Sequence, residues 1–192
     1  LIDPSTPDVT GHVLEALGIA GFDRSSKPIQ HALEYVRKNQ KKDGSWFGRW
    51  GVNYVYGTSA VLSGLAAVDE PMDQPYVQRA VAWLLGVQNP DGGWGESCAS
   101  YDENRFIAME STASQTAWGL IGLLSVPSIA DDHPAVRRAV DYLIQHQNAD
   151  GGWTEPHWTG TGFPKHFYLR YDYYRLYFPL LALGRYAQRS GS

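Results

Sequence analysis

Cysteine is nearly absent from this sequence, since Cys98 is the single cysteine in 192 residues. One thiol excludes an internal disulfide framework and fits a reducing compartment. An excess of basic residues is also lacking, because 16 Lys and Arg stand against 20 Asp and Glu and the pI is near 5.8. This charge balance excludes the basic surface typical of nucleic-acid binding, so no nucleic-acid partner is expected.

Long apolar runs and targeting signals are missing as well. No apolar run reaches the roughly 18 residues that a membrane-spanning helix needs. The start, "LIDPSTPDVTGH", lacks the basic and apolar stretches of a signal peptide, and it lacks an initiator Met, so we expect a chain cut from a longer one. No His/Cys spacing predicts a metal site. Cys98 has no base at a recognisable spacing and is interpreted as structural, with His133 next to a helix cap and His157 in a loop.

A repeat occurs three times in the sequence. It reads "HALEYVRKNQKKDGSW", "RAVAWLLGVQNPDGGW" and "RAVDYLIQHQNADGGW", in each case a helical segment ending in Gln, an Asp-Gly turn and a Trp. A recurring unit of this size predicts a helical array. We interpret the Gln as a partner for free backbone groups at a helix end and the Trp as its packing partner, rather than as a carbohydrate-binding strip. These repeat residues are Gln40, Trp46, Gln88, Trp94, Gln147 and Trp153.

The expected helices alternate in character along the chain. Amphipathic segments are expected to lie outside, at 28–39, 74–88 and 133–147. Segments that are apolar nearly all round, or rich in aromatic residues, are expected to lie inside, at 8–17, 58–68, 115–126 and 172–188. This alternation predicts an all-α fold, one partial α/α toroid over residues 1–192 that forms part of an α6-α6 barrel. Three outer and four inner helices do not close such a barrel, so an apolar edge should be exposed.

Aromatic residues gather outside the repeats, in Gly-rich stretches before the inner helices. The stretches are "GSWFGRWGVNYVYG" from residue 44 and "WTGTGFPKHFYLRYDYYRLYFP" from residue 158. A third segment, "DVTGHVLEALG", carries Asp8 and His12 four residues apart, on one face of a helix. On local grounds, Asp8 could instead be a helix N-cap and His12 a core histidine with a satisfied ring.

We expect these three segments to meet at one rim, as an aromatic mouth beside a carboxylate and an imidazole. Such a mouth suits a flat apolar ligand or, in a dry cavity, the stabilisation of a carbocation by the faces of the rings. Few basic or nucleophilic groups lie among the rings, which favours the second function.

The repeats resemble the QW motifs of the triterpene cyclases. "DGSWFGRWGVNYVYGTSAVL", "STASQTAWGLIGLL" and "TGFPKHFYLRYDYYRLYFPLLALGRYAQ" closely resemble the C-terminal part of bacterial squalene–hopene cyclases, and the resemblance covers essentially the whole chain. The oxidosqualene cyclases are the alternative. They typically carry Cys in the loop after Trp-Gly, where this chain has Asn53, and they lack the His of "DVTGH".

The resemblance implies a two-domain α/α-barrel enzyme that protonates squalene, or a related polyprene, and cyclises it to hopene or hopanol without a cofactor. It also implies peripheral attachment to the cytoplasmic face of the bacterial cell membrane and a homodimer. The family's acid is the middle Asp of an Asp-x-Asp-Asp motif. This chain lacks it, because Asp131-Asp132 has another context. We therefore expect a fragment that is inactive without the remainder of the cyclase chain. The alternative function is a free-standing α/α domain that binds a lipid or sugar through its aromatic rim.

The resemblance also implies roles for single residues. His12 resembles the histidine that hydrogen-bonds the catalytic Asp, Asp8 the carboxylate that supports this histidine, and Tyr56 the tyrosine that tunes the acid region and its reprotonation. Rings near the cations along the cascade and wall positions that hold the substrate are expected at Trp50, Phe163, Phe167, Leu169, Tyr171 and Tyr174.

Overall fold

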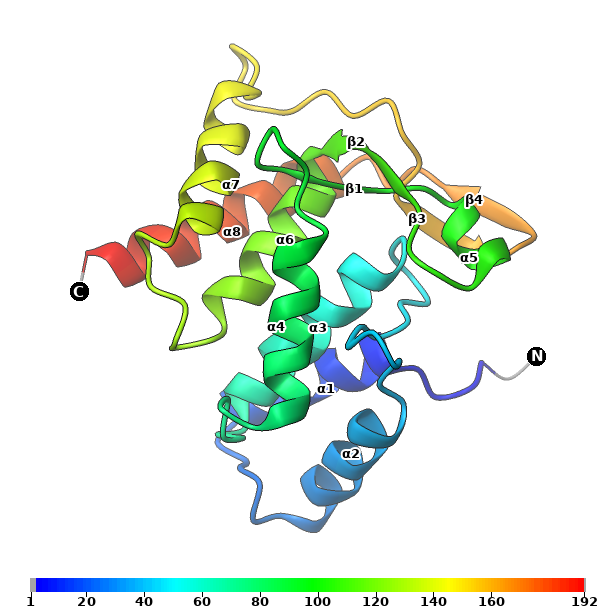
Figure 1. Ribbon diagram of the computed structural model, residues 1–192, viewed down its shortest axis with the longest axis vertical. Coiled ribbons are helices and arrows are strands. Elements are labelled where there is room, and N and C mark those ends of the chain that lie inside the picture. Colours follow the sequence, from blue (N-terminus) through cyan, green and yellow to red (C-terminus); the bar gives the residue numbers. More distant parts are fainter. Residues whose placement is uncertain (1–2, 192) are drawn as a thin grey trace.

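The computed structural model describes residues 3–191 and shows helices with two small two-stranded sheets beside them (Figure 1). The helices are α1 (Pro7–Ile19), α2 (Lys27–Lys38), α3 (Tyr54–Ala67), α4 (Pro75–Gly86), α5 (Ala99–Glu103), α6 (Ala113–Leu124), α7 (Pro134–Gln145) and α8 (Tyr174–Ser190). The strands are β1 (Trp94–Glu96) paired with β2 (Ala108–Thr112), and β3 (Gly160–Phe163) paired with β4 (Phe167–Leu169), both antiparallel. Within residues 3–191, no helix is both long and apolar enough to cross a membrane.

The expected alternation of inner and outer helices is confirmed. Helices α1, α3, α6 and α8 pack in that order as one layer, and α2, α4 and α7 each pack on the outer side of this layer. All residues of α6 and nearly all of α3 are buried, whereas α2 and α7 bury one stripe each. Each outer helix has a Pro in its first turn, where the missing N–H is not needed. The predicted all-α class therefore holds, and the two small sheets are additions to it.

Two details of the sequence prediction are wrong. Helix α3 begins at Tyr54 rather than at residue 58, so Tyr56 and Gly57 lie in the helix and not in a loop. The two small sheets were not expected, because their strands are only three to five residues long and β1 and β3 contain Gly. The early start of α3 has a tertiary cause, since the buried Glu96 accepts hydrogen bonds from the N–H groups of Asn53 and Val55.

The predicted apolar edge lies on the two outermost helices of the inner layer. Helix α8 buries only Pro179 and Ala182, while Leu180 and Leu181 are exposed. Val9 and Val13 are exposed on α1. The expectation that α8 is buried like α3 and α6 is thus wrong for this chain, because α8 has a neighbour in the inner layer on one side only.

The Trp of every repeat, and the Gln of the first two repeats, hydrogen-bond to a neighbouring element, as their structural interpretation expects. Each Trp indole donates to a helix carbonyl ten residues earlier: Trp46 to Val36 at 2.7 Å, Trp94 to Leu84 at 3.0 Å and Trp153 to Leu143 at 2.8 Å. The Gln40 amide donates to Gly44 O in its own turn and to Tyr76 O at the start of α4. Gln88 repeats this pattern with Gly92 O and with Ala135 O at the start of α7.

The third repeat gives a testable contrast, because Gln147 donates to Gly151 O and is exposed. Gln40 makes two such bonds and also accepts one from Arg79 at 2.7 Å. We expect Gln40→Ala to lower the free energy of unfolding by about 2 kcal/mol and Gln147→Ala by less than about 1 kcal/mol. Urea denaturation measures both, with Gln88→Ala as a control that should match Gln40→Ala. Equal losses of unfolding free energy in Gln40→Ala and Gln147→Ala would contradict the inference that the hydrogen bond from Gln40 to the next helix contributes to stability.

Glycines bring the backbones of α1 and α3 into direct contact. A Cβ atom at Gly11 would lie 2.5 Å from Ala60 O, and one at Gly64 would lie 2.3 Å from Gly11 O. Only hydrogen atoms fit at these two positions, so the two helix axes approach more closely than side chains would permit. This close approach places His12, next to Gly11, beside the side chains of α3.

Candidate functional site

The predicted acid-side residues His12 and Tyr56 meet between α1 and α3. His12 Nε2 lies 2.9 Å from the Tyr56 hydroxyl, and the ring centroids are 5.6 Å apart. Burial raises the pKa of Tyr56 well above its ordinary value, so the phenol stays neutral. A neutral phenol can donate to an unprotonated Nε2 or accept from Nε2–H, so the contact persists in either state of the ring. His12 itself is exposed, so the core-histidine alternative is wrong.

Asp8 does not have the helix-capping role considered from the sequence. It lies inside α1, whose N-cap is Thr6, and its carboxylate is fully buried. Oδ2 accepts from the backbone N–H groups of Arg49, at 2.8 Å, and Trp50, at 3.1 Å. Oδ1 has no hydrogen-bond partner among residues 3–191. Asp8 therefore holds the loop that carries Trp50, while the hydrogen bond of His12 goes to Tyr56.

An aromatic cluster adjoins Tyr56, and two of its members were missed by the sequence analysis. Trp118 of α6 lies 4.8 Å from Tyr56, 5.7 Å from Tyr174 and 5.4 Å from Phe178, measured between ring centroids. Tyr171 packs on Tyr174 at 4.7 Å. The predicted wall positions Tyr171 and Tyr174 thus join Tyr56 through Trp118. Because "QTAWGLIGLL" is largely apolar, the sequence pattern did not distinguish Trp118 from an ordinary core residue.

Trp50 and Phe163 come together around a cation that the sequence analysis did not expect. The buried guanidinium of Arg49 lies 4.4 Å from the Trp50 ring centroid and 5.4 Å from that of Phe163. Arg49 also donates to Thr161 Oγ1 at 3.1 Å and pairs with Asp3 at 3.3 Å. Arg49 is thus one of the few basic groups among the rings, and it lies directly against two of them. The guanidinium lies over both rings, and Trp50 and Phe163 are 37% and 39% exposed, so part of each ring is open to a ligand.

The contribution of the Arg49 guanidinium to stability can be tested by removing its charge. Arg49→Met should lower the free energy of unfolding by about 2 kcal/mol, because two cation–π contacts and a buried hydrogen bond are lost. Arg49→Lys is the control; it keeps the charge but loses the planar fork, so an intermediate loss is expected. Thermal and urea denaturation measure both. Wild-type stability of Arg49→Met would show that the stacked guanidinium contributes nothing.

The loop before α3 and the hairpin before α8 lie side by side, as expected for one rim. Val52 N donates to Thr159 O at 2.9 Å, and Thr161 N donates to Trp50 O at 3.3 Å. Glycine permits the pairing, because a Cβ atom at Gly160 would lie 2.3 Å from the Tyr171 ring. The half-buried Leu169 pairs with Gly160 across the same hairpin.

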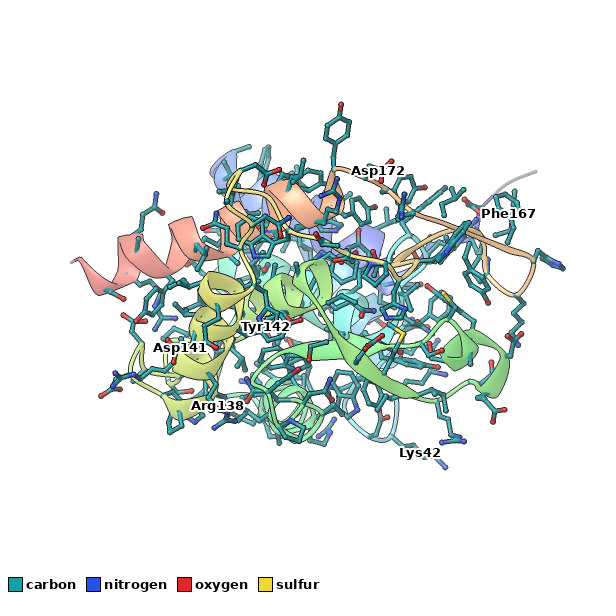
Figure 2. The ribbon with its side chains drawn as sticks, turned by 90° about the horizontal axis from the view of Figure 1, so that it is seen from above. Lys42, Arg138, Asp141, Tyr142, Phe167 and Asp172 are labelled. Atoms are coloured by element: carbon teal, nitrogen blue, oxygen red, sulfur yellow. The ribbon has the colours of Figure 1, made fainter. Side chains whose placement is uncertain are left out.

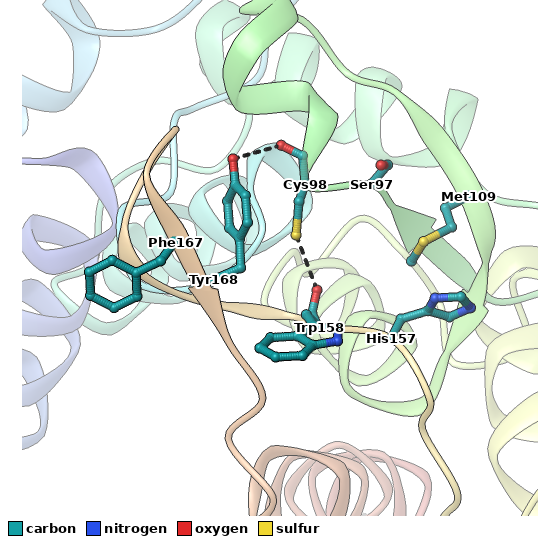
Figure 3. A pocket seen from close by; sticks show the side chains of 7 residues that line it. All are labelled: Ser97, Cys98, Met109, His157, Trp158, Phe167 and Tyr168. Carbon is teal, nitrogen blue, oxygen red and sulfur yellow. Dashed lines mark hydrogen bonds between the residues drawn. The ribbon is translucent and has the colours of Figure 1, made fainter.

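Phe167 lies opposite Phe163, beside the turn of the β3–β4 hairpin (Figure 2). Its ring contacts Phe163 at 5.4 Å between centroids, and Phe167 is one of the residues that line an open pocket of about 530 Å³ (Figure 3). Other apolar side chains line this pocket, and the Cys98 thiol points to the backbone carbonyl of Trp158 at 3.4 Å. Burial raises the pKa of Cys98 to about 11, so the thiol stays protonated, which agrees with its interpretation as structural. No group of His, Cys, Asp and Glu within residues 3–191 could hold a metal ion.

The fold resembles that of solved structures that include an ent-copalyl diphosphate synthase and a type II terpene cyclase. The chain superposes on ent-copalyl diphosphate synthase from Streptomyces platensis with a TM-score of 0.69 at 23% sequence identity, over 97% of this chain and 34% of that one. At this identity the likeness concerns the fold alone. It supports the reading of the inner and outer helices as part of an α/α toroid.

The sequence comparisons identify the family. The model of the squalene–hopene cyclase C-terminal domain matches residues 1–188, and the chain belongs to this family. It is 54% identical to the squalene–hopene cyclase of Alicyclobacillus acidocaldarius over 187 residues and 47% identical to that of Zymomonas mobilis over 188 residues. Each alignment covers 97% of this chain, but only 29% of the Alicyclobacillus protein and 28% of the Zymomonas protein. The chain thus spans less than a third of these relatives.

Proposed function

We propose that this chain forms the C-terminal wall of a class II terpene cyclase cavity. The cyclase would protonate squalene or a related polyprene and guide the carbocations to hopene or hopanol. The family membership supports the reaction class, and the contact between His12 Nε2 and the Tyr56 hydroxyl at 2.9 Å, beside the cluster around Trp118, carries the proposal for this chain.

Each group in the proposal has a distinct task. His12 would hydrogen-bond the acid of an Asp-x-Asp-Asp motif supplied by another segment of the cyclase. As an imidazolium it would favour the ionised carboxylate, which makes the proton easier to give. Neutral Tyr56 would hold the imidazole, and Asp8 would fix the Trp50 loop. The exposed parts of the Trp50 and Phe163 rings would stabilise the cations, at about 0.5–2 kcal/mol per ring, and Tyr171 and Tyr174 would hold the folded substrate.

The surroundings of the full enzyme belong to the same proposal. The exposed apolar edge on α1 and α8 would be covered by the remainder of the cyclase chain. Peripheral attachment to the cytoplasmic face of the bacterial cell membrane and homodimer formation are further proposals, based on the resemblance alone.

A chimera tests the proposal directly. Residues 1–188 replace the corresponding segment of the Alicyclobacillus squalene–hopene cyclase, and products from squalene are measured by gas chromatography. We expect cyclised product from the chimera and none from the isolated chain. His12→Ala in the chimera should lower turnover by about tenfold, because the histidine acts on the acid rather than on substrate.

Three other results of this experiment would contradict parts of the proposal or favour the alternative function. Hopene formation by the isolated chain would contradict its expected inactivity. Unchanged turnover in His12→Ala and Trp50→Ala would refute their roles. A folded chimera without activity, together with squalene binding by the isolated chain, would favour a free-standing lipid-binding domain.

A further inference from the structure

The dipeptide Asp-Gly occurs three times in the sequence, once in the turn of each repeat, at Asp43, Asp91 and Asp150. The three turns share one backbone geometry. Each Gly has a positive φ, between 84° and 101°, and donates its N–H to the carbonyl three residues earlier. Each Asp carboxylate accepts from the N–H two residues later, at 2.9–3.0 Å. The chain thus contains three copies of one dipeptide, and only their surroundings differ.

An Asp-Gly dipeptide can isomerise without a catalyst, because Gly has no side chain that shields its nitrogen. The Gly nitrogen attacks the side-chain carboxyl carbon, and its proton leaves with the carboxyl hydroxyl as one water molecule while a succinimide ring closes. One water molecule then opens the ring at either carbonyl. Opening at one carbonyl restores Asp, and opening at the other gives isoaspartate, whose main chain is longer by one CH₂ group. Water lost equals water gained, so the reaction needs no co-reactant.

The first two turns are each covered by the outer helix that follows them. Gly44 and Gly92 are buried, and a Cβ atom at either would lie 2.6 Å from a backbone carbonyl oxygen of α4 or α7. The Gln before each turn donates to the first residues of the same helix. A Ser hydroxyl adds a second hydrogen bond to each Asp carboxylate, at 2.7 Å in both turns. These contacts must break before the Gly nitrogen can reach the carboxyl carbon.

The third turn has no such cover within residues 3–191, because α8, the helix that follows it, belongs to the inner layer. Gly151 is exposed, and nothing lies within 4 Å of an added Cβ atom. The Gln147 amide donates within the turn, to Gly151 O at 2.8 Å. Among residues 3–191, the carboxylate of Asp150 accepts one hydrogen bond, from Gly152 N. This turn can therefore open locally while the helices around it stay in place.

We propose that Asp150–Gly151 is a modification site, where the folded chain converts Asp150 to isoaspartate spontaneously while Asp43 and Asp91 are protected. The three dipeptides have the same chemistry and the same turn geometry. The cover over the Gly and the second hydrogen bond to the carboxylate therefore decide which of them reacts. The site is independent of the proposed cyclase function, since the reaction uses only the turn and water.

The modification would act on the junction between α7 and α8. Gln147 and Trp153 form an antiparallel bridge across the turn, and the added CH₂ group lies between them. Trp153 contacts both helices, because its indole donates to Leu143 O of α7 and its carbonyl accepts from Arg175 of α8. Isoaspartate in this turn is therefore expected to loosen the attachment of α8 to α7.

Incubation of the folded chain at neutral pH and physiological temperature tests the proposal. The protease Asp-N cleaves before Asp but not before isoaspartate, so digestion followed by mass spectrometry gives the converted fraction at each position. We expect conversion at Asp150 to be at least about tenfold faster than at Asp43 or Asp91, because two further hydrogen bonds must break in each of the other turns. Asp150→Glu should abolish conversion at this position, since the longer side chain does not form the five-membered ring.

The chain unfolded in urea is the control, and there the three rates should agree within about threefold, because only the local sequence remains. Equal rates at the three positions of the folded chain would overturn the proposal. A tenfold contrast that persists in urea would overturn it as well, because the neighbouring residues would then be its cause. Gln40→Ala removes the hydrogen bond to α4 and should speed conversion at Asp43 by about fivefold. An unchanged rate at Asp43 in this variant would refute the protection by the following helix.

Discussion

Gly11→Ala should lower the free energy of unfolding by about 3 kcal/mol, because the added methyl group has no space. Its Cβ atom would lie 2.5 Å from Ala60 O and 2.8 Å from Val61 N, which are backbone atoms of α3 that cannot rotate away. The two helices must separate, and the hydrogen bond between His12 and Tyr56 separates with them. Urea denaturation measures the loss, and the NMR signals of the His12 ring report the broken contact.

Gly184→Ala is the matched control for this substitution. Gly184 lies inside α8, and nothing lies within 4 Å of an added Cβ atom. Alanine there should raise the free energy of unfolding by about 0.5 kcal/mol through its higher helix propensity. If Gly11→Ala also proves as stable as wild type, the close approach of α1 and α3 does not position the candidate site.

The sequence was sufficient for features that repeat along the chain. Three copies of the Gln-turn-Trp unit, and the alternation of amphipathic and apolar segments, predicted both helical layers, because periodic burial leaves a periodic pattern. The rim was predictable for the same reason, since each aromatic stretch precedes an inner helix. His12 and Tyr56 could be named only through the resemblance, because 43 residues separate them and no local pattern joins them.

Single tertiary contacts were not predictable. Arg49 reads as a lone charge in a loop, and its position between Trp50 and Phe163 depends on a hairpin more than 100 residues later. Asp8 reads as a helix cap, yet its partners are backbone groups 41 and 42 residues away. Glu96 and Glu155 occupy a recognisable place in the sequence, because each stands two residues after a repeat Trp. In the structure, each accepts hydrogen bonds from the first residues of an inner helix.

Glu96 should make the chain less stable as the pH rises from about 4.5 to about 7. Burial raises the pKa of Glu96 from its ordinary value of 4.5 to about 7, although the N–H groups of Asn53 and Val55 oppose this shift. Below pH 4.5 the carboxyl is protonated in both the folded and the unfolded chain. Between the two pKa values the folded chain keeps a proton that the unfolded chain has released, so increasing pH favours unfolding. The shift corresponds to a loss of about 3 kcal/mol across this window.

Glu96→Gln should abolish this pH dependence, because an amide oxygen can still accept from the backbone of α3 but carries no charge. Urea denaturation at intervals from pH 4.5 to 8 measures the difference between variant and wild type. Above pH 7 the variant should be the more stable protein, since it does not bury an ionised carboxylate. Glu155→Gln alters the equivalent position before α6 and leaves Glu96 in place, so the decline should persist in that control. A decline that survives in Glu96→Gln would assign it to another group and would leave the start of α3, and with it Tyr56, independent of the Glu96 charge.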